Sequence, residues 1–348
     1  MTLHSFGNAM ADSEWPEPVS GEGEQPEMRE QRPLVVALVL NWNGYSILYE
    51  SKSILGLCLS SLIRARYSNL KIILADAQSQ DDSVAFTSRE FKSVTVIRVP
   101  NEGTAPSYNS AMKYALDRYP TLDYILMLNN DLIFDTGFLD KMVNVAEFKE
   151  GVGIVGCRLL YPNGTIQHCG SHDSITGEPT MIRHQTKSGV VDSVVGAVFL
   201  VKVAVIRKVG LFDDRFAPFG HDDVDYCQRA KAAGYDTFLV ADKVIHLESY
   251  TLRGHGESKW SESQISHSLR RGHYLYSLKW HKLRLPLLLA NRLLANTIGL
   301  VVRRSPRIRL RRMREAAVTI GHLESDIVAF ADAISLYSMR ATKDPKLN

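Results

Sequence analysis

An aspartate that directly follows a predicted buried strand is the first candidate for chemistry in this sequence. Asp131 ends the run Leu128-Asn129-Asn130-Asp131. One or two such carboxylates can hold Mg²⁺ or Mn²⁺ while phosphate oxygens and water fill the remaining coordination positions. The alternative is a turn aspartate that bonds its own backbone, which is the more common use of Asn-Asp clusters after strands. Taken by itself, Asp131 leaves both interpretations open.

A second group of carboxylates lies at the start of a predicted helix over residues 223–233. Asp222, Asp223 and Asp225 stand there, and Gly234 ends the helix. Acidic residues in a first turn cap free N–H groups and suit the helix dipole, which is a structural use. A functional use requires one carboxylate to act as a general base, and a neighbouring carboxylate would raise its pKa. From the residues alone, the structural and the functional use are about equally supported.

Candidate residues also follow two other predicted strands. A lone histidine beside apolar residues, such as His246, is usually a satisfied core group, but a neutral imidazole at a strand end can complete a metal site. Asn101 precedes Gly103, which would let the backbone approach a ligand closely; a strand–turn–helix joint is the alternative. The sequence has no P-loop, GxGxxG or GxSxG motif, so it lacks the residues those mechanisms need.

The candidate residues lie at the ends of strands that alternate with helices in the predicted structure. Continuous apolar runs predict buried strands at residues 34–40, 70–75, 94–99 and 124–128. Helical spacing predicts helices at residues 54–66 and 105–119. Such alternation predicts a mostly parallel sheet, in which ligands collect at the carboxyl ends of the strands. At those ends the sequence carries Asn41, Asp76, Asn101 and Asp131.

The second half of the chain has a different pattern. Between residues 151 and 249, short strands are predicted at residues 154–160, 194–201 and 237–240. After His246 the sequence becomes helical and basic. We therefore predict an α/β fold, Rossmann-like, with helices on both faces of a central sheet and a helical, basic C-terminal extension.

Composition excludes several classes of protein. The 348 residues are 45% hydrophobic and 23% charged, which is typical of a soluble globular protein and excludes collagen, coiled-coil and wholly disordered chains. Four scattered cysteines without CxxC spacing make a disulfide scaffold or cysteine zinc site unlikely. Residues 1–32 carry seven acids and two bases and predict a disordered tail without a signal peptide. Residues 270–314 carry thirteen Lys or Arg and no acid.

Eight short motifs in order carry a resemblance to a known family. They are Asn41-Trp42-Asn43-Gly44, Ile73-Leu74-Ala75-Asp76, Asn101-Glu102-Gly103, Leu128-Asn129-Asn130-Asp131, Val195-Gly196-Ala197, Gly210-Leu211-Phe212-Asp213-Asp214-Arg215-Phe216, Asp222-Asp223-Val224-Asp225 and Ala233-Gly234-Tyr235. Over about residues 34–250, the chain resembles family 2 glycosyltransferases with the GT-A fold, most of all the rhamnosyltransferase-like branch. The implied domains are a tail at 1–32, a catalytic domain at 33–250 and a helical region at 251–348.

The resemblance implies roles for individual residues. The positions that match nucleotide-sugar contacts are Asn41, Asn43, Asp76, Asn101, Gly103 and Asn130. Asp131 matches the last aspartate of a DxD-type motif, which binds Mg²⁺ or Mn²⁺ on the donor diphosphate, and His246 matches a histidine of the metal shell. Asp223 matches the catalytic base, with Asp222 in the preceding acidic position.

Four of these motifs depart from the family pattern. The usual Phe-Asp-Glu is Phe212-Asp213-Asp214 here, which keeps the charge and shortens one side chain. The usual Asp-Asn-x-Ser is Asp76-Ala77-Gln78-Ser79 here, which bears on base recognition. The usual Asn-Pro-Asp is Asn129-Asn130-Asp131, without an earlier acid, which bears on metal affinity. The usual Glu-Asp pair is Asp222-Asp223, which keeps the charge and shortens one side chain.

The implied reaction is an inverting, metal-dependent transfer of a hexosyl or deoxyhexosyl group. The donor would be a UDP- or dTDP-linked sugar, and the acceptor a glycan or polyprenyl-linked glycan of a surface polysaccharide or cell wall. One alternative is another metal-dependent sugar-nucleotide enzyme, such as a nucleotidyltransferase. That enzyme would usually have a Gly-rich, basic loop after the first strand, and residues 41–46 have neither property. The other alternative is an inactive GT-A module that binds glycan or membrane.

The basic C-terminal region predicts a partner surface. Residues 285–302 are apolar but interrupted by Pro286, Asn291, Arg292 and Asn296, which suits a spanning helix poorly. With the arginines that follow, residues 285–314 suit an interfacial helix on an anionic membrane. Packing on the catalytic domain is the second interpretation, and nucleic acid, for which no motif is present, is the third. We therefore expect a cytoplasmic protein, peripheral on the inner face of the cell membrane, that binds no nucleic acid.

Overall fold

The computed structural model describes residues 31–174, 179–182, 184, 187–247, 260–282 and 325–338. By its internal contacts the chain divides into two units, residues 1–32 and 33–348, and the following description concerns the second. Two predicted regions lie outside the described residues. They are the acidic tail, except for residues 31 and 32, and the basic stretch 285–314.

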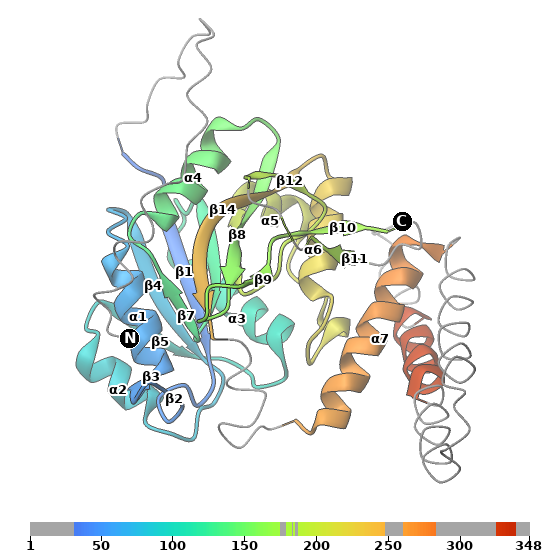
Figure 1. Cartoon of the computed structure of the whole chain (residues 1–348), viewed down its shortest axis with the longest axis horizontal. Coiled ribbons are helices and arrows are strands. Elements are labelled where there is room, and N and C mark those ends of the chain that lie inside the picture. The colour runs from blue at the N-terminus through green and yellow to red at the C-terminus, as the bar shows by residue number, and fades with distance from the viewer. Residues whose placement is uncertain are drawn as a thin grey trace, which may run out of the picture. The chain divides into compact units, whose positions relative to one another are not determined.

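The central sheet has the strand order β12-β14-β8-β13-β6-β1-β4-β5 (Figure 1). Its parallel part consists of β1 (Val35–Asn41), β4 (Leu70–Asp76), β5 (Val94–Arg98) and β6 (Tyr124–Asn129). β1 pairs in parallel with both β4 and β6, and β4 pairs in parallel with β5. These are the four strands that the apolar runs predicted, so the predicted sheet is confirmed.

The other part of the sheet is mixed. Its longer strands are β8 (Val152–Leu160), β13 (Val198–Lys202) and β14 (Asp236–His246). β13 runs antiparallel to β6 and β8, whereas β14 runs parallel to β8. The short strands β7 (Leu132–Phe134) and β12 (Gly189–Val191) pair antiparallel with β14, and β9 (Ile166–His168) pairs antiparallel with β8. Two small hairpins complete the strands: β2 (Leu48–Tyr49) with β3 (Lys52–Ser53), and β10 (Ser171–Asp173) with β11 (Pro179–Met181).

Two predicted strand boundaries differ from the structure. The strand predicted at 237–240 continues to His246, because a register shift between Val240 and Lys243 takes up the intervening residues without ending the pairing. The strand predicted at 194–201 begins only at Val198.

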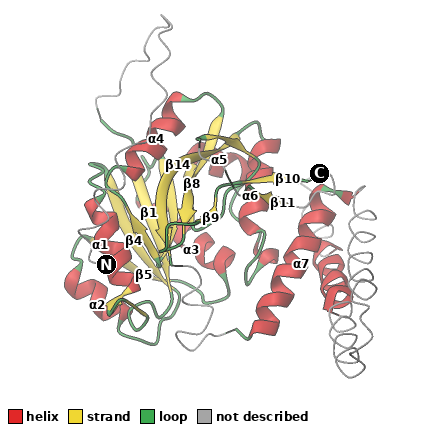
Figure 2. Ribbon diagram, in the orientation of Figure 1, coloured by secondary structure: helices red, strands yellow, loops and turns green. Residues whose placement is uncertain are grey.

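Helices cover both faces of the sheet (Figure 2). In chain order they are α1 (Ile54–Arg64), α2 (Ser83–Glu90), α3 (Thr104–Arg118), α4 (Phe138–Phe148), α5 (Val203–Val209), the 3₁₀ helix η2 (Asp214–Phe216), α6 (Asp222–Ala232) and α7 (Glu262–Trp280). Residues 325–338 are also helical. Among the described residues, no helix is both long and apolar enough to cross a bilayer.

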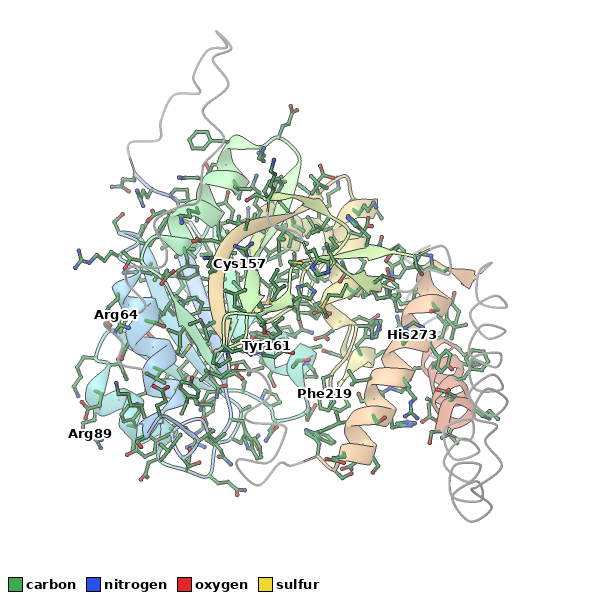
Figure 3. All side chains as sticks on the ribbon, viewed as in Figure 1. Arg64, Arg89, Cys157, Tyr161, Phe219 and His273 are labelled. Atoms are coloured by element: carbon green, nitrogen blue, oxygen red, sulfur yellow. The ribbon has the colours of Figure 1, made fainter. Side chains whose placement is uncertain are left out.

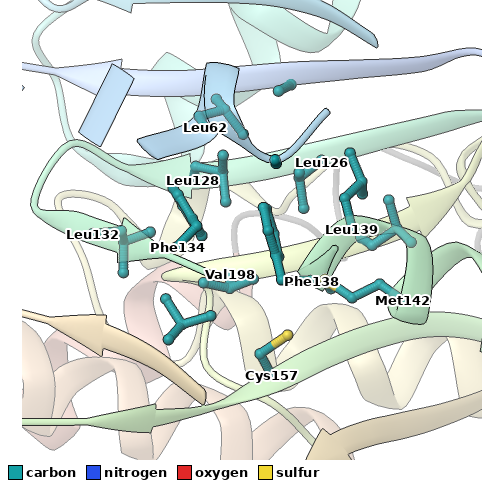
Figure 4. Packing of buried hydrophobic residues seen from close by; sticks show 14 of the residues in the cluster. Leu62, Leu126, Leu128, Leu132, Phe134, Phe138, Leu139, Met142, Cys157 and Val198 are labelled. Atoms are coloured by element: carbon teal, nitrogen blue, oxygen red, sulfur yellow. The ribbon is translucent and has the colours of Figure 1, made fainter. Parts of the chain in front are cut away.

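The apolar core lies in two layers, one on each face of the sheet. Side chains alternate along β1, so Ala37 and Val39 belong to one cluster while Val36 and Leu38 belong to the other. The first layer packs beneath α1 and α4, and Figure 4 shows its residues Leu62, Leu126, Leu128, Phe138, Leu139 and Met142. The second layer packs beneath α3, α5 and α6. Burial on both faces explains why the strands read as continuous apolar runs.

A third apolar cluster joins α7 to η2 and to the helical residues 325–338. Phe216 of η2 packs with Tyr274, Leu275 and Tyr276 of α7, and Ala329 and Ala333 of the helical residues 325–338 pack on the same cluster. Figure 3 labels His273 on α7 and Phe219 in the segment that leads into α6. Ser268 of α7 donates a hydrogen bond to the Phe219 carbonyl at 2.7 Å. The described part of the C-terminal region therefore packs on η2 and on the segment that leads into α6.

Buried charges also hold α7 in place. Lys279 Nζ lies 2.8 Å from Asp213 Oδ2 and 2.5 Å from Asp225 Oδ1. Trp280 Nε1 donates to the same Asp225 oxygen at 2.9 Å. Burial disfavours ionised Asp213, but hydrogen bonds and charge from Arg215 and Lys279 outweigh it and lower the pKa of Asp213. These aspartates are fixed by cations.

We predict that Lys279→Met lowers the free energy of unfolding by about 3 kcal/mol, since it leaves two buried carboxylates without a shared cation. Urea unfolding of the whole chain measures this loss. The exposed Lys113→Met on α3 is the matched control and should unfold like the wild type. A loss below about 1 kcal/mol would show that Lys279 is not needed to neutralise these carboxylates.

Candidate active site

The ends of three parallel strands meet in one hydrogen-bonded group. Asn41 ends β1, and its Nδ2 donates to Asp76 Oδ1 at 3.2 Å. Its Oδ1 accepts a hydrogen bond from Asn130 Nδ2, just after β6, at 2.7 Å. Asn41, Asp76 and Asn130 are all buried. The structure therefore brings together three residues that were predicted to contact the donor nucleotide.

The loop after β1 is bonded to the loop after β4. The Ser79 hydroxyl accepts from Asn41 Nδ2 at 3.1 Å and from the Asn43 N–H at 2.9 Å. Asn43 Oδ1 accepts from the Gln80 N–H at 2.7 Å, and the Ser79 N–H donates to Asp76 Oδ2 at 3.1 Å. The departure from the family motif at Ala77 thus leaves Asp76 and Ser79 joined by a hydrogen bond.

Asp131 and His246 face each other across the carboxyl end of the sheet. His246 Nε2 lies 3.2 Å from Asp131 Oδ1, and the Leu247 N–H donates to the Asp131 carbonyl at 3.0 Å. Asp131 is 3% exposed and His246 is 9% exposed. The pairing of β7 with β14 aligns His246 with Leu132, the residue after Asp131, and so sets this contact.

Sequence reasoning missed Gln167, whose side chain contacts the Nδ1 side of the His246 ring. Gln167 Oε1 lies 2.7 Å from His246 Nδ1, on the side of the ring away from Asp131. Its strand, β9, pairs antiparallel with the last two residues of β8, Leu159 and Leu160. Tyr161, which Figure 3 labels, directly follows β8. Only the pairing of distant strands shows this contact, so no local signal could have revealed it.

Asp222 and Asp223 occupy the first turn of α6 and are partly buried. Asp222 Oδ2 accepts from Thr104 Oγ1 at 2.8 Å. Asp223 Oδ2 accepts from the Gly196 N–H at 2.8 Å, and its Oδ1 accepts from the Val224 N–H at 2.8 Å. Burial, followed by the charge of Asp222, raises the pKa of Asp223 to about 7. Burial also raises the pKa of Asp222.

Gly103 fits a tight joint between α3 and the segment before α6. It has φ of +123°, and an added Cβ would lie 2.2 Å from the Pro218 carbonyl oxygen. The next residue, Thr104, donates its N–H to that oxygen at 2.8 Å. The close approach that Gly103 permits is therefore to Pro218, as the strand–turn–helix alternative expected. Asn101 lies in the same loop, after β5.

Tyr108 is a buried tyrosine on α3 whose pKa is affected by carboxylates of both centres. It stands one turn after Thr104 on α3, is 4% exposed, and its hydroxyl has no hydrogen-bond partner among the described residues. Burial raises the pKa of Tyr108, and the charges of Asp222 and then Asp131 raise it further. Both carboxylates therefore act on one phenol. Sequence reasoning missed Tyr108, because a tyrosine on the apolar face of a helix reads as core.

The Asp131–His246 pair suits a divalent cation that also binds substrate. One carboxylate oxygen and one imidazole nitrogen are acceptable ligands for Mn²⁺ and, less favourably for the nitrogen, for Mg²⁺. No group of three or more potential metal-binding side chains occurs in the part of the chain that the structure describes. The remaining ligands would have to come from phosphate and water, which is usual for Mg²⁺ at phosphate sites.

We predict that the Asp223 carboxyl titrates near pH 7, as a ¹³C-NMR titration of labelled aspartate would measure. Asp222→Asn should lower this midpoint, since it removes the neighbouring negative charge while the burial of Asp223 remains. Asp236→Asn, an exposed site on β14, is the control and should leave the midpoint unchanged. A wild-type midpoint near pH 4 would show that burial and Asp222 do not raise the pKa of Asp223.

The sequence matches a protein family over residues 47–210, described as glycosyl transferase family 2. The O-antigen biosynthesis protein RfbC of Myxococcus xanthus is 33% identical over 146 residues, which cover 38% of this chain and 11% of that protein. The uncharacterized protein y4gI of Sinorhizobium fredii (strain NBRC 101917 / NGR234) is 24% identical over 244 residues, covering 66% of this chain and 26% of that protein. The matches thus span a small part of each relative's length.

A solved structure has a similar fold. The crystal structure of GalNAc-T7 with UDP, GalNAc and Mn²⁺ matches with a TM-score of 0.53 and 13% identity, covering 72% of this chain and 49% of that chain. At this identity the likeness concerns the fold alone. Together, the family match, which runs from before α1 to the end of α5, and this structural likeness confirm the predicted resemblance to family 2 glycosyltransferases. Residues 47–210 therefore match the glycosyl transferase family 2, and the described fold is similar to that of GT-A glycosyltransferases.

Proposed function

We propose that this glycosyltransferase moves a sugar from a nucleoside-diphosphate sugar to a glycan or polyprenyl-linked acceptor, with inversion and with a divalent cation, Mg²⁺ or Mn²⁺. The observation that carries the proposal is the Asp131–His246 contact at 3.2 Å at the carboxyl end of the sheet, together with Asp222 and Asp223 in the first turn of α6. A cation site and a base are the two components that such a transfer requires.

The donor would lie along the carboxyl ends of the parallel strands. Asn41, Asn43 and Asp76 would contact the base and ribose, and Asn130, Asn101 and Gly103 would lie nearer the sugar and diphosphate. Two of these roles have structural support, since Asn41 and Asp76 are rigidly bonded at the edge where ligands of such sheets bind. UDP and dTDP are the nucleotides we propose.

Asp131 and His246 would hold the cation against the donor diphosphate. When bound, a divalent cation neutralises the charge that develops on the leaving diphosphate. Because nucleoside diphosphate leaves without protonation once its charge is balanced, the chain needs no general acid of the kind that glycoside hydrolases use. One carboxylate for the acceptor is then sufficient.

Asp223 would accept the proton of the attacking acceptor hydroxyl. The acceptor oxygen bonds to the anomeric carbon from the face opposite the diphosphate, the bond from that carbon to the diphosphate oxygen breaks, and the configuration inverts. The Gly196 and Val224 N–H groups fix the Asp223 carboxylate, and Asp222 raises its pKa to make it a better base. The base is active when deprotonated, so turnover should rise as pH increases through about 7.

The pathway and the location belong to the proposal as well. The name of the Myxococcus xanthus relative favours surface polysaccharide synthesis. We propose a catalytic domain at residues 33–250, of the rhamnosyltransferase-like branch, and a helical region at 251–348. Residues 285–314 would contact an anionic membrane at its inner, cytoplasmic face, where a polyprenyl-linked acceptor would be available.

We predict that Asp131→Asn abolishes metal-dependent turnover and weakens binding of UDP in the presence of Mn²⁺, because an amide is a poorer cation ligand than a carboxylate. Titration calorimetry with UDP and dTDP, with and without Mn²⁺, measures the change. Asp117→Asn on the outer part of α3 is the control and should bind like the wild type. Equal nucleotide affinity in Asp131→Asn and wild type would refute the metal role.

We predict that Asp223→Asn leaves Mn²⁺–UDP binding intact and lowers turnover by about 10²–10⁴, the usual contribution of a positioned base. Rates with a panel of UDP-, dTDP- and GDP-sugars measure turnover, and calorimetry measures binding. Asp236→Asn serves again as the matched control. A near-normal rate would move the base elsewhere, first to Asp222.

A further inference from the structure

We infer that Gln167 is a positioning residue that fixes the tautomer of His246, so that an unprotonated Nε2 faces Asp131. The inference rests on the proposed function, because it concerns the residues that would hold the cation. It goes beyond that function by adding a residue that carries no charge and touches neither substrate nor cation.

The architecture of the sheet brings the two side chains together. Ile245 of β14 and Ile166 of β9 are both paired with Leu160 of β8, one on each side of that strand. His246 and Gln167 are the residues that follow these partners. Their side chains meet at the end of β8, where Gln167 Oε1 lies 2.7 Å from His246 Nδ1.

The chemistry of this contact determines where the imidazole proton lies. An amide oxygen only accepts hydrogen bonds, so the short contact requires the proton on His246 Nδ1. In the neutral ring, Nε2 then carries a lone pair. Asn129 Nδ2, a donor, lies 3.5 Å from this nitrogen and is compatible with that tautomer. An Nδ1–H bonded to an oxygen is the arrangement that orients metal-binding histidines in general.

This tautomer matters because the unprotonated Nε2 of His246 faces the carboxylate of Asp131. Its Oδ1 lies 3.2 Å from His246 Nε2, and both atoms are then electron-pair donors. Two such atoms at this distance repel each other unless a cation or a proton lies between them. Gln167 would therefore prepare the pair for a cation before any cation arrives.

Burial makes Gln167 suitable for this task. Its Nε2 is buried and has no hydrogen-bond partner among the described residues, so the bond through Oε1 is the one that anchors the amide.

The test measures Mn²⁺ binding to the full chain by titration calorimetry, with Mn²⁺ alone and with Mn²⁺ plus UDP. Gln167→Leu removes the acceptor and should weaken Mn²⁺ binding about 10–100-fold, the usual effect of losing such a partner. Gln167→Glu keeps an oxygen that accepts from Nδ1–H and should bind Mn²⁺ within about threefold of the wild type or more tightly. If Gln167→Leu does not fold, Gln167→Met, which keeps the length of the side chain, replaces it.

Gln228→Leu on α6 is the matched control. The side-chain amide of Gln228 also makes a hydrogen bond, from its Nε2 to Asp173 Oδ2 at 2.7 Å, but its partner is not His246. It should bind Mn²⁺ like the wild type. A spectroscopic readout separates positioning from general destabilisation: pulsed EPR should show ¹⁴N coupling between Mn²⁺ and an imidazole in the wild type and in Gln167→Glu, and a reduced coupling in Gln167→Leu.

Each outcome has a distinct meaning. If the wild type binds no Mn²⁺ with or without UDP, the proposed metal-dependent function fails. If the wild type and Gln167→Leu bind equally and show the same ¹⁴N coupling, the proposed function stands and the role of Gln167 is overturned. If Gln167→Glu is as weak as Gln167→Leu, the amide acts through its N–H groups, and the inferred tautomer is wrong.

Discussion

Uncompensated negative charge at the carboxyl edge of the sheet is the constraint on which this site depends. Among the described residues, Asp131, Asp222 and Asp223 form no ion pair with lysine or arginine; they are held by His246, by the Thr104 hydroxyl and by backbone N–H groups. Such partners fix a carboxylate in place without neutralising it. The site therefore keeps an affinity for a cation and for a proton, which are the two species that the proposed transfer moves or binds.

Two nearby carboxylates, in contrast, are neutralised by ion pairs with lysine and arginine. Asp213 and Asp225 share Lys279, and each has its own arginine, Arg215 or Arg229. Asp225 lies only two residues after Asp223 in the same helix, so the first turn of α6 holds both the carboxylate of the proposed base and a carboxylate that cations neutralise. The buried pair anchors α7 and thereby fixes the helix that carries the proposed base.

The sequence was sufficient for the parallel strands and for the polar residues at their ends, because strands buried on both faces leave continuous apolar runs and abrupt polar stops. It was insufficient where distant strands decide the contacts. His246 was a candidate, but its place beside Asp131 depends on two features that the apolar runs did not predict. One is the short strand β7, and the other is the register shift that extends β14. Gln167 and Tyr108 carry no local signal, since a polar residue on an edge strand and a tyrosine on a helix are common in any fold.

Crystals soaked with Mn²⁺ and UDP give the most direct test of the shared site. An anomalous difference map recorded at the manganese absorption edge locates the ion without reference to activity. The account predicts a peak within bonding distance of both Asp131 Oδ1 and His246 Nε2, with the diphosphate of UDP on its other side. A peak bound elsewhere, or ordered UDP beside Asn41 and Asp76 with no peak beside Asp131, would contradict the proposed site.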